Sequence, residues 1–208
     1  MNGGSRDTVN EGTKDTKATK ETLVMKSGRM WTIGLVMALV STRGVGAVSA
    51  QDKYTLKVPG GLAFSEFRGY ESWEFIALSQ GELVAAILGN PAMIQAYKDG
   101  YPGNGKPIPD GAKMAKVHWT PKKNVSAPGQ PTVPGALHDV DFMVKDSKRF
   151  GDSGGWGYAA FKYDGAKGAY TPQTTADAPP QANDAKCGFG CHTIVKNRDY
   201  VFTDYGAR

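Results

Sequence analysis

Apolar and polar positions alternate along three segments in the second half of the chain, a period typical of β-strands. Residues 112–119 predict one strand, 137–144 a second and 155–163 a third, which is rich in aromatic residues. On the first two strands one face carries Ala115, Val117, Trp119, Val140, Phe142 and Val144. The opposite face carries Met114, Lys116, His118, Asp139, Asp141 and Met143. The pattern therefore predicts strands whose two faces differ in chemistry.

The segments between these strands predict short helices and loops. Residues 83–88 are apolar, and Asn90-Pro91 matches an N-cap followed by the first helical residue, so we expect a short helix over 92–99 that Gly100 ends. Residues 101–111 and 120–135 are punctuated by Pro or Gly and are expected to be loops, and 164–186 an irregular approach to the C-terminal motif. A helical turn should follow His192, and then an extended piece over 200–203. The fold class predicted is α+β, a mainly antiparallel sheet with a few short helices.

The first 50 residues look like processing sequence rather than domain. Residues 1–24 form a polar extension, and 25–50 combine a basic start, a short apolar run and small residues ending at Ala50. This order is typical of a secretory signal peptide, and the apolar run, interrupted by Arg43, is too short to span a bilayer. An uncleaved anchor is the alternative, and Met25 could be the true start. We expect a periplasmic or secreted mature domain over 51–208.

The charge balance argues against a nucleic-acid partner. The whole chain has 25 Lys/Arg and 20 Asp/Glu, a net charge of +5. Residues 1–50 hold seven of the basic and four of the acidic residues, so the mature domain keeps 18 and 16 and a net charge of only +2. The basic character lies mostly in the leader, and we expect the mature form to bind neither nucleic acid nor membrane.

The chemistry-bearing motif is Cys187-Gly188-Phe189-Gly190-Cys191-His192, which contains both cysteines of the chain. Two thiols followed by an imidazole suit covalent haem attachment, with thioethers from the cysteines and iron ligation by the histidine. The usual spacing has two residues between the cysteines, and here there are three. We expect a loop in which the flanking glycines tolerate positive φ.

Other readings of the same residues stay open. Cys187 and Cys191 could form a small-loop disulfide, half of a zinc site completed by His118 and His138, or a redox dithiol. His118 or His138 could instead be a distal iron ligand, although a half-buried strand position and a solvent-facing one are the simpler expectations. Met114 and Met143 are expected to fill the core.

Several segments, in this order, resemble the cytochrome P-460 family. They are Ala86–Pro91, Pro109–Ala112, Ala115–Trp119, Phe142–Ser147, Gly154–Tyr158, Cys187–His192 and Asp199–Thr203. The resemblance implies a β-rich periplasmic homodimer with one haem c per subunit, held by Cys187, Cys191 and His192, with His192 as the iron ligand. The family includes hydroxylamine oxidases, in which a lysine is covalently joined to the haem, and cytochromes c-prime-beta, which bind nitric oxide in an apolar pocket.

On this likeness Lys116 matches the cross-linking lysine, and Asp141 lies near the position of the carboxylate that accepts protons from substrate. The expected function is hydroxylamine oxidation at an open haem iron, with electrons passed to a soluble acceptor such as a small cytochrome. Departures from the pattern are the Cys spacing, an aspartate where a glutamate is expected, and Ala85-Ala86 where the oxidases carry an arginine. Alternatives are a non-enzymatic nitric oxide binder and a haem-free, disulfide-stabilised binding module. Lys116 and Asp141 could also be ordinary solvated strand residues.

Overall fold

The computed structural model describes residues 51–58, 61–173 and 183–207, and for residues 183–187 it describes the backbone alone. The predicted extension and signal peptide therefore lie outside the described residues. No helix within the described ranges is both long enough and apolar enough to cross a membrane.

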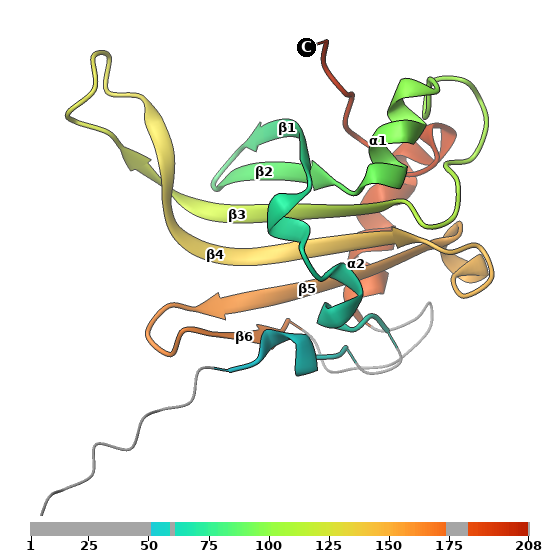
Figure 1. Cartoon of the computed structure of the whole chain (residues 1–208), viewed down its shortest axis with the longest axis horizontal. Helices are drawn as coiled ribbons and strands as arrows, with labels where there is room; N and C mark the ends of the chain where they lie inside the picture. Colours follow the sequence, from blue (N-terminus) through green and yellow to red (C-terminus); the bar gives the residue numbers. More distant parts are fainter. Residues whose placement is uncertain (1–50, 59–60, 174–182, 208) are drawn as a thin grey trace, which may run out of the picture. The chain divides into compact units, whose positions relative to one another are not determined.

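Six antiparallel strands form one sheet in the order β1-β2-β3-β4-β5-β6, so each strand pairs with its neighbour in sequence (Figure 1). The strands are β1 (Glu74–Gln80), β2 (Val84–Gly89), β3 (Lys113–Lys123), β4 (Thr132–Lys145), β5 (Trp156–Asp164) and β6 (Ala169–Pro172). The helices are α1 (Pro91–Lys98) and α2 (Asn183–His192). Short 3-10 turns are η1 (Lys53–Thr55), η2 (Phe64–Phe67), η3 (Tyr70–Ser72), η4 (Gly151–Ser153) and η5 (Thr193–Arg198). The predicted α+β class is confirmed.

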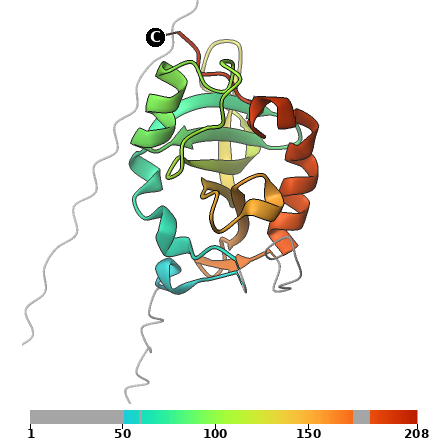
Figure 2. The same ribbon diagram turned by 90° about the vertical axis from the view of Figure 1, so that its right-hand side faces the viewer.

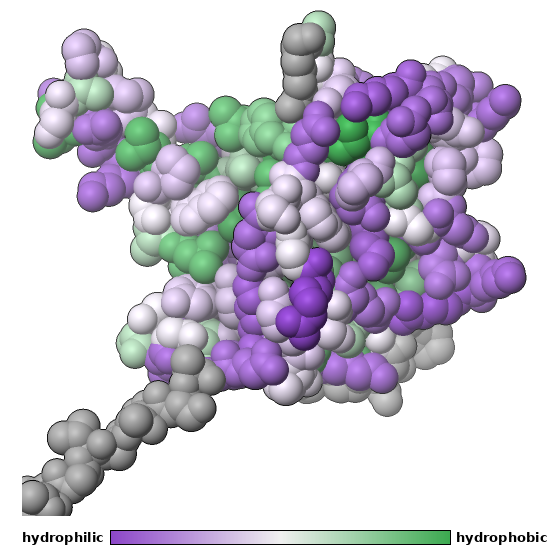
Figure 3. All heavy atoms as spheres, viewed as in Figure 1, coloured by the Kyte–Doolittle hydropathy of each residue, from purple (hydrophilic) through white to green (hydrophobic). Residues whose placement is uncertain are grey.

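The alternating pattern places a separate hydrophobic core on each face of the sheet. Ala115 and Val117 on β3 and Phe142 on β4 belong to one core, which η2 closes with Phe64 and Phe67, both fully buried. Phe67 stacks on Phe142 with ring centroids 4.1 Å apart. In Figure 2 the N-terminal turns, η2 among them, and helix α2 lie on opposite sides of the sheet. On the side shown in Figure 3, hydrophilic residues dominate and hydrophobic ones gather toward the β3–β4 hairpin.

The second core lies on the face that carries Met114 and Met143, both buried as predicted. Helix α1 packs there, and the Asn90 side chain accepts a hydrogen bond from the Met93 N–H at 2.9 Å, as an N-cap should. Pro91 is the first helical residue, because its missing N–H needs no partner in the first turn. The predicted helix start is confirmed.

Two expected loops are shorter than predicted. Strands β3 and β4 continue through Lys122 and Val133 as a hairpin beyond the pairing with β2 and β5, so the expected 120–135 loop shrinks to residues 124–131. The prolines at 121 and 134 face each other in this two-stranded extension, where one strand side has no neighbour to bond. The expected irregular stretch 164–186 likewise contains β6 and the start of α2.

Candidate functional site

A cavity of about 810 Å³ lies on the second face of the sheet, between strands β1–β5 on one side and α2 with the C-terminal segment on the other. Its volume falls in the range of about 300–1,000 Å³ typical of small-molecule and cofactor sites. Apolar side chains make much of the wall: Leu78, Ile87, Met114, Met143, Tyr158 and Phe202. Lys116, Asp141, Cys191 and His192 also line it. Four of the five residues predicted for the site therefore meet at one cavity.

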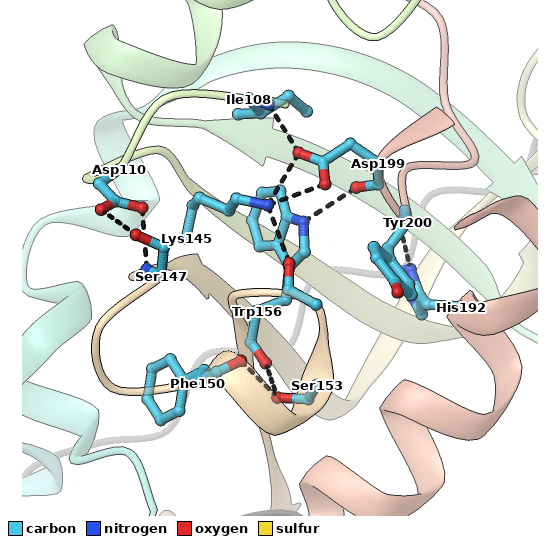
Figure 4. A network of polar contacts seen from close by, with 11 residues as sticks. Ile108, Asp110, Lys145, Ser147, Phe150, Ser153, Trp156, His192, Asp199 and Tyr200 are labelled. Carbon is cyan, nitrogen blue, oxygen red and sulfur yellow. Dashed lines mark hydrogen bonds and ion pairs between the residues drawn. The ribbon is translucent and has the colours of Figure 1, made fainter. Parts of the chain in front are cut away.

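His192 ends α2 with its ring fixed from three sides. Its Nδ1 lies 2.5 Å from the carbonyl oxygen of Tyr200 (Figure 4), and its ring centroid lies 5.2 Å from that of Tyr158 and 4.9 Å from that of Phe202. Because a carbonyl oxygen can only accept, Nδ1 carries the hydrogen, and the neutral ring keeps its lone pair on Nε2. This is the tautomer that a metal-binding histidine needs.

The surroundings of His192 also favour its neutral form. Burial lowers the pKa of His192 below its ordinary value; the hydrogen bond to Tyr200 opposes this shift, and the positive charge of Lys116 reinforces it. At neutral pH the imidazole is therefore available as a ligand. The influence of Lys116 also agrees with its place in the wall of the same cavity.

The cysteine motif is helical, which corrects the predicted loop. Residues 187–191 lie inside α2, and neither Gly188 nor Gly190 has a positive φ. The three intervening residues place positions 187 and 191 about one helical turn apart, on the same side of α2. The Cys191 thiol is free and exposed, while the side chain of Cys187 is outside the described atoms.

The glycine at position 188 allows α2 to approach β5 closely. A Cβ at Gly188 would lie only 2.8 Å from ring atoms of Tyr158, whereas one at Gly190 would meet nothing within 4 Å. Gly188 therefore serves helix-to-sheet packing rather than an unusual backbone conformation.

Lys116 and Asp141 sit opposite each other on adjacent strands. They are direct partners in the β3–β4 register, and Ile87 and Ala160 flank them on β2 and β5. Lys116 is half-buried and the Asp141 side chain is 45 % exposed. Both line the cavity rather than an outer solvated face, so a positive and a negative side chain are presented together to its contents.

Beside this pair lies a polar cluster that sequence reasoning did not assemble. His118 Nδ1 is 2.5 Å from Asp139 Oδ1 and 3.8 Å from Asp141 Oδ2, and His138 Nδ1 is 2.8 Å from Asp139 Oδ2. Burial raises the pKa of Asp139, but the two histidines outweigh burial and the pKa lies below its ordinary value. Neither histidine lines the cavity, which argues against distal iron ligation.

This cluster also bears on the zinc alternative. Within the described residues, His118, Asp139 and Asp141 are the group of potential metal ligands that converge, and Cys191 is not among them. His138 is half-exposed, near the solvent-facing position expected, and its contact with Asp139 was not foreseen.

Three residues near the site were missed from the sequence, because one acts through its backbone and the other two act from a distance. The Tyr200 carbonyl is the partner of His192, and Lys145 forms a buried ion pair with Asp199 on the adjoining turn. A signal was available for Lys145 alone, since a lysine that continues the apolar run 142–144 must find a partner if the strand is buried.

Comparison with protein families gives one result that bears directly on this site. A search of curated proteins finds no match to the chain. The family model described as Cytochrome P460 matches residues 67–203, which is more than half of the chain and includes every predicted site residue. The chain therefore belongs to the cytochrome P460 family, and the cofactor that this membership implies is haem.

Proposed function

We propose that the protein is an exported c-type haem protein that oxidises hydroxylamine to nitrogen oxides. The observation that carries the proposal is the composition of one cavity, in which a neutral histidine shares the wall with a lysine and a carboxylate on adjacent strands. Each residue type has a task in such chemistry: iron ligation, modification of the cofactor and proton removal.

The residues present fit a haem. His192 has the tautomer of an iron ligand, Cys191 is a free thiol in the same wall, and apolar side chains from five strands suit a macrocycle. Cys187 and Cys191 would hold the group covalently, one helical turn apart, so a three-residue spacing on a helix keeps both positions on one side. When bound, haem would supply an iron centre able to take electrons from a nitrogen substrate.

Asp141 is the proposed proton acceptor. Oxidation of hydroxylamine releases protons together with electrons, and a carboxylate in the cavity wall can take them up if it comes within hydrogen-bond reach of the substrate. Its partial exposure gives the protons a way to water. Lys116 is proposed as the residue joined to the haem, since it is half-buried in the same wall and a lysine ammonium there is costly unless it is paired or used.

A second candidate is a nitric oxide binding protein without catalysis. It is favoured by the apolar residues that line much of the cavity and by the short reach of Asp141, one methylene less than a glutamate. This alternative keeps the same cofactor and the same roles for Cys187, Cys191 and His192, and differs in leaving Asp141 unused.

Export, dimerisation and the electron partner belong to the same proposal. The leader-like composition of residues 25–50 supports export, and a soluble electron acceptor is required because oxidation must pass its electrons on. The resemblance to the family supports a homodimer.

The test is the visible spectrum of the reduced full chain, produced in a host that attaches c-type haem, together with its rate of hydroxylamine oxidation. A strongly red-shifted Soret band and turnover would support the proposal, and Lys116→Ala should then restore an ordinary haem c spectrum. Lys122→Ala, an exposed lysine on the same strand, is the matched control and should change nothing. An ordinary band with nitric oxide binding but no turnover would favour the second candidate. Absence of a haem band would overturn both.

A further inference from the structure

The residue that holds Nδ1 of His192 lies in an unusual turn. Asp199 and Tyr200 both have left-handed backbone conformations, with φ of 47° and 64°. Two consecutive non-glycine residues of this kind are unfavourable and persist only where the surrounding contacts hold them. The turn points the Tyr200 carbonyl at Nδ1 of His192.

A buried ion pair fastens the first residue of this turn. Lys145 Nζ, at the end of β4, donates to both carboxylate oxygens of Asp199 at 2.8 and 2.9 Å and to the Gly154 carbonyl at 3.0 Å (Figure 4). The side chains of Lys145 and Asp199 are only 5 % and 12 % exposed. The backbone N–H of Ile108 also donates to Asp199, at 2.6 Å. The Asp199 carboxylate therefore has partners on both oxygens.

The backbone of the turn is held from the other side by Trp156 and Gly154. The indole Nε1 of Trp156 donates to the Asp199 carbonyl at 2.9 Å, and Trp156 is fully buried. The Tyr200 ring covers Gly154 so closely that a Cβ there would lie 2.2 Å from it. The side chain and the backbone of the turn are thus both held in place. The orientation of the Tyr200 carbonyl toward His192 is fixed as a result.

We propose that Lys145 and Asp199 are positioning residues for His192, acting through the Tyr200 carbonyl. They touch neither the cavity nor its contents; they hold the turn that fixes the tautomer and ring orientation of His192 and strengthens it as a donor to iron. This role rests on the proposed function of His192 as iron ligand. It also gives a role to Lys145, Trp156 and Asp199, three residues that do not line the cavity.

The test compares haem-loaded variants of the full chain. In Lys145→Met and Asp199→Asn the hydrogen bond to Nδ1 should weaken, so the iron–histidine stretching frequency of the reduced protein should fall and the reduction potential should rise. Lys145→Arg keeps the charge and should retain most of the wild-type values. Arg149→Met removes the more exposed ion pair with Glu66 and is the matched control, with no shift expected.

If Lys145→Met does not fold, Asp199→Asn and Trp156→Phe replace it as the test. Asp199→Asn removes the negative charge of the turn at constant side-chain volume, and Trp156→Phe removes the indole N–H that donates to the Asp199 carbonyl while keeping a smaller aromatic ring. Shifts in both would support the role. Folded variants with wild-type frequency and potential would overturn it, since a pair that serves stability alone would not alter the iron–histidine bond. A wild-type chain without haem, or without an iron–histidine signal, would overturn the proposed function and this role with it.

Discussion

The two sides of the cavity are built in contrasting ways. On the α2 side, His192 is backed by a chain of buried contacts that runs through Tyr200 and Asp199 to Lys145. On the sheet side, Lys116 and Asp141 stand on adjacent strands and remain partly exposed. The proposed roles agree with this contrast: a histidine that holds a cofactor needs one orientation, and the ring of His192 is fixed by a hydrogen bond. Groups that exchange protons with a substrate need contact with water, and the side chains of Lys116 and Asp141 keep part of their surface exposed.

The largest effect is expected from His192→Ala, which removes the imidazole on the α2 side of the cavity. The variant loses the proposed iron ligand, and we expect hydroxylamine oxidation to fall to the background rate and the haem spectrum to change. Spectroscopy and turnover measured on the same sample would show this. His138→Ala removes a histidine that does not line the cavity and should behave like wild type. Retained turnover in His192→Ala would place the ligand elsewhere.

On the sheet side, Asp141→Asn should lower turnover by about 100-fold or more, since an amide of the same size cannot accept a proton as general base. Haem content and spectrum should not change, because Asp141 has no part in holding the cofactor. Asp152→Asn, an exposed carboxylate in η4, is the control. An unchanged rate in Asp141→Asn would move proton removal to another group and strengthen the nitric oxide binding alternative.

The contrast also predicts different stabilities. Lys145→Met leaves the buried Asp199 carboxylate without its cation and should lower the free energy of unfolding by about 3–5 kcal/mol. Arg149→Met removes a pair whose side chains are 45 % and 26 % exposed and should cost about 0–1 kcal/mol. Denaturant titration of both variants measures the difference. Equal losses of stability in the two variants would mean that the buried Lys145–Asp199 pair contributes no more to folding than the exposed Arg149–Glu66 pair.

A smaller effect on stability is expected where α2 packs against β5. Gly188→Ala should displace α2 from Tyr158 and lower the stability by about 1–3 kcal/mol, the usual cost of overpacking. Gly190→Ala meets nothing within 4 Å and lies in the same helix, so it should be neutral or slightly stabilising. Thermal unfolding gives the comparison, and a neutral Gly188→Ala would show that α2 is not tightly seated.

The smallest effect concerns the loss of stability at acidic pH. The pKa of Asp139 is lower in the folded chain than its ordinary value of 3.8, so its charged form stabilises the fold at pH above that value. The contribution is lost as the pH falls below 3.8 through the folded pKa. Asp139→Asn should therefore lose stability at neutral pH and show a flatter fall below about pH 4. Parallel pH curves for the two proteins would exclude Asp139 as a source of acid sensitivity.

Local pattern was enough to predict much of the fold. The faces of β3 and β4 followed from period-two alternation, because successive side chains of a strand point to opposite faces of the sheet, and α1 followed from Asn90-Pro91 and its apolar residues. Prediction failed where the signal was weak or misleading. Prolines at 121 and 134 suggested a loop but lie in a hairpin extension that tolerates them, and glycines at 188 and 190 suggested a turn but lie in a helix.

The sequence by itself determined the chemistry available to this protein: two cysteines and a histidine in one motif, a lysine and an aspartate in two different predicted strands, and the alternation that builds the sheet. Only the tertiary structure decided how these residues work together. Lys145 and Asp199 are 54 positions apart, and the partner of His192 is a carbonyl, which every residue carries. Sequence patterns report periodicity and side-chain type, whereas the direction of a backbone group depends on contacts between distant segments that form only when the chain has folded.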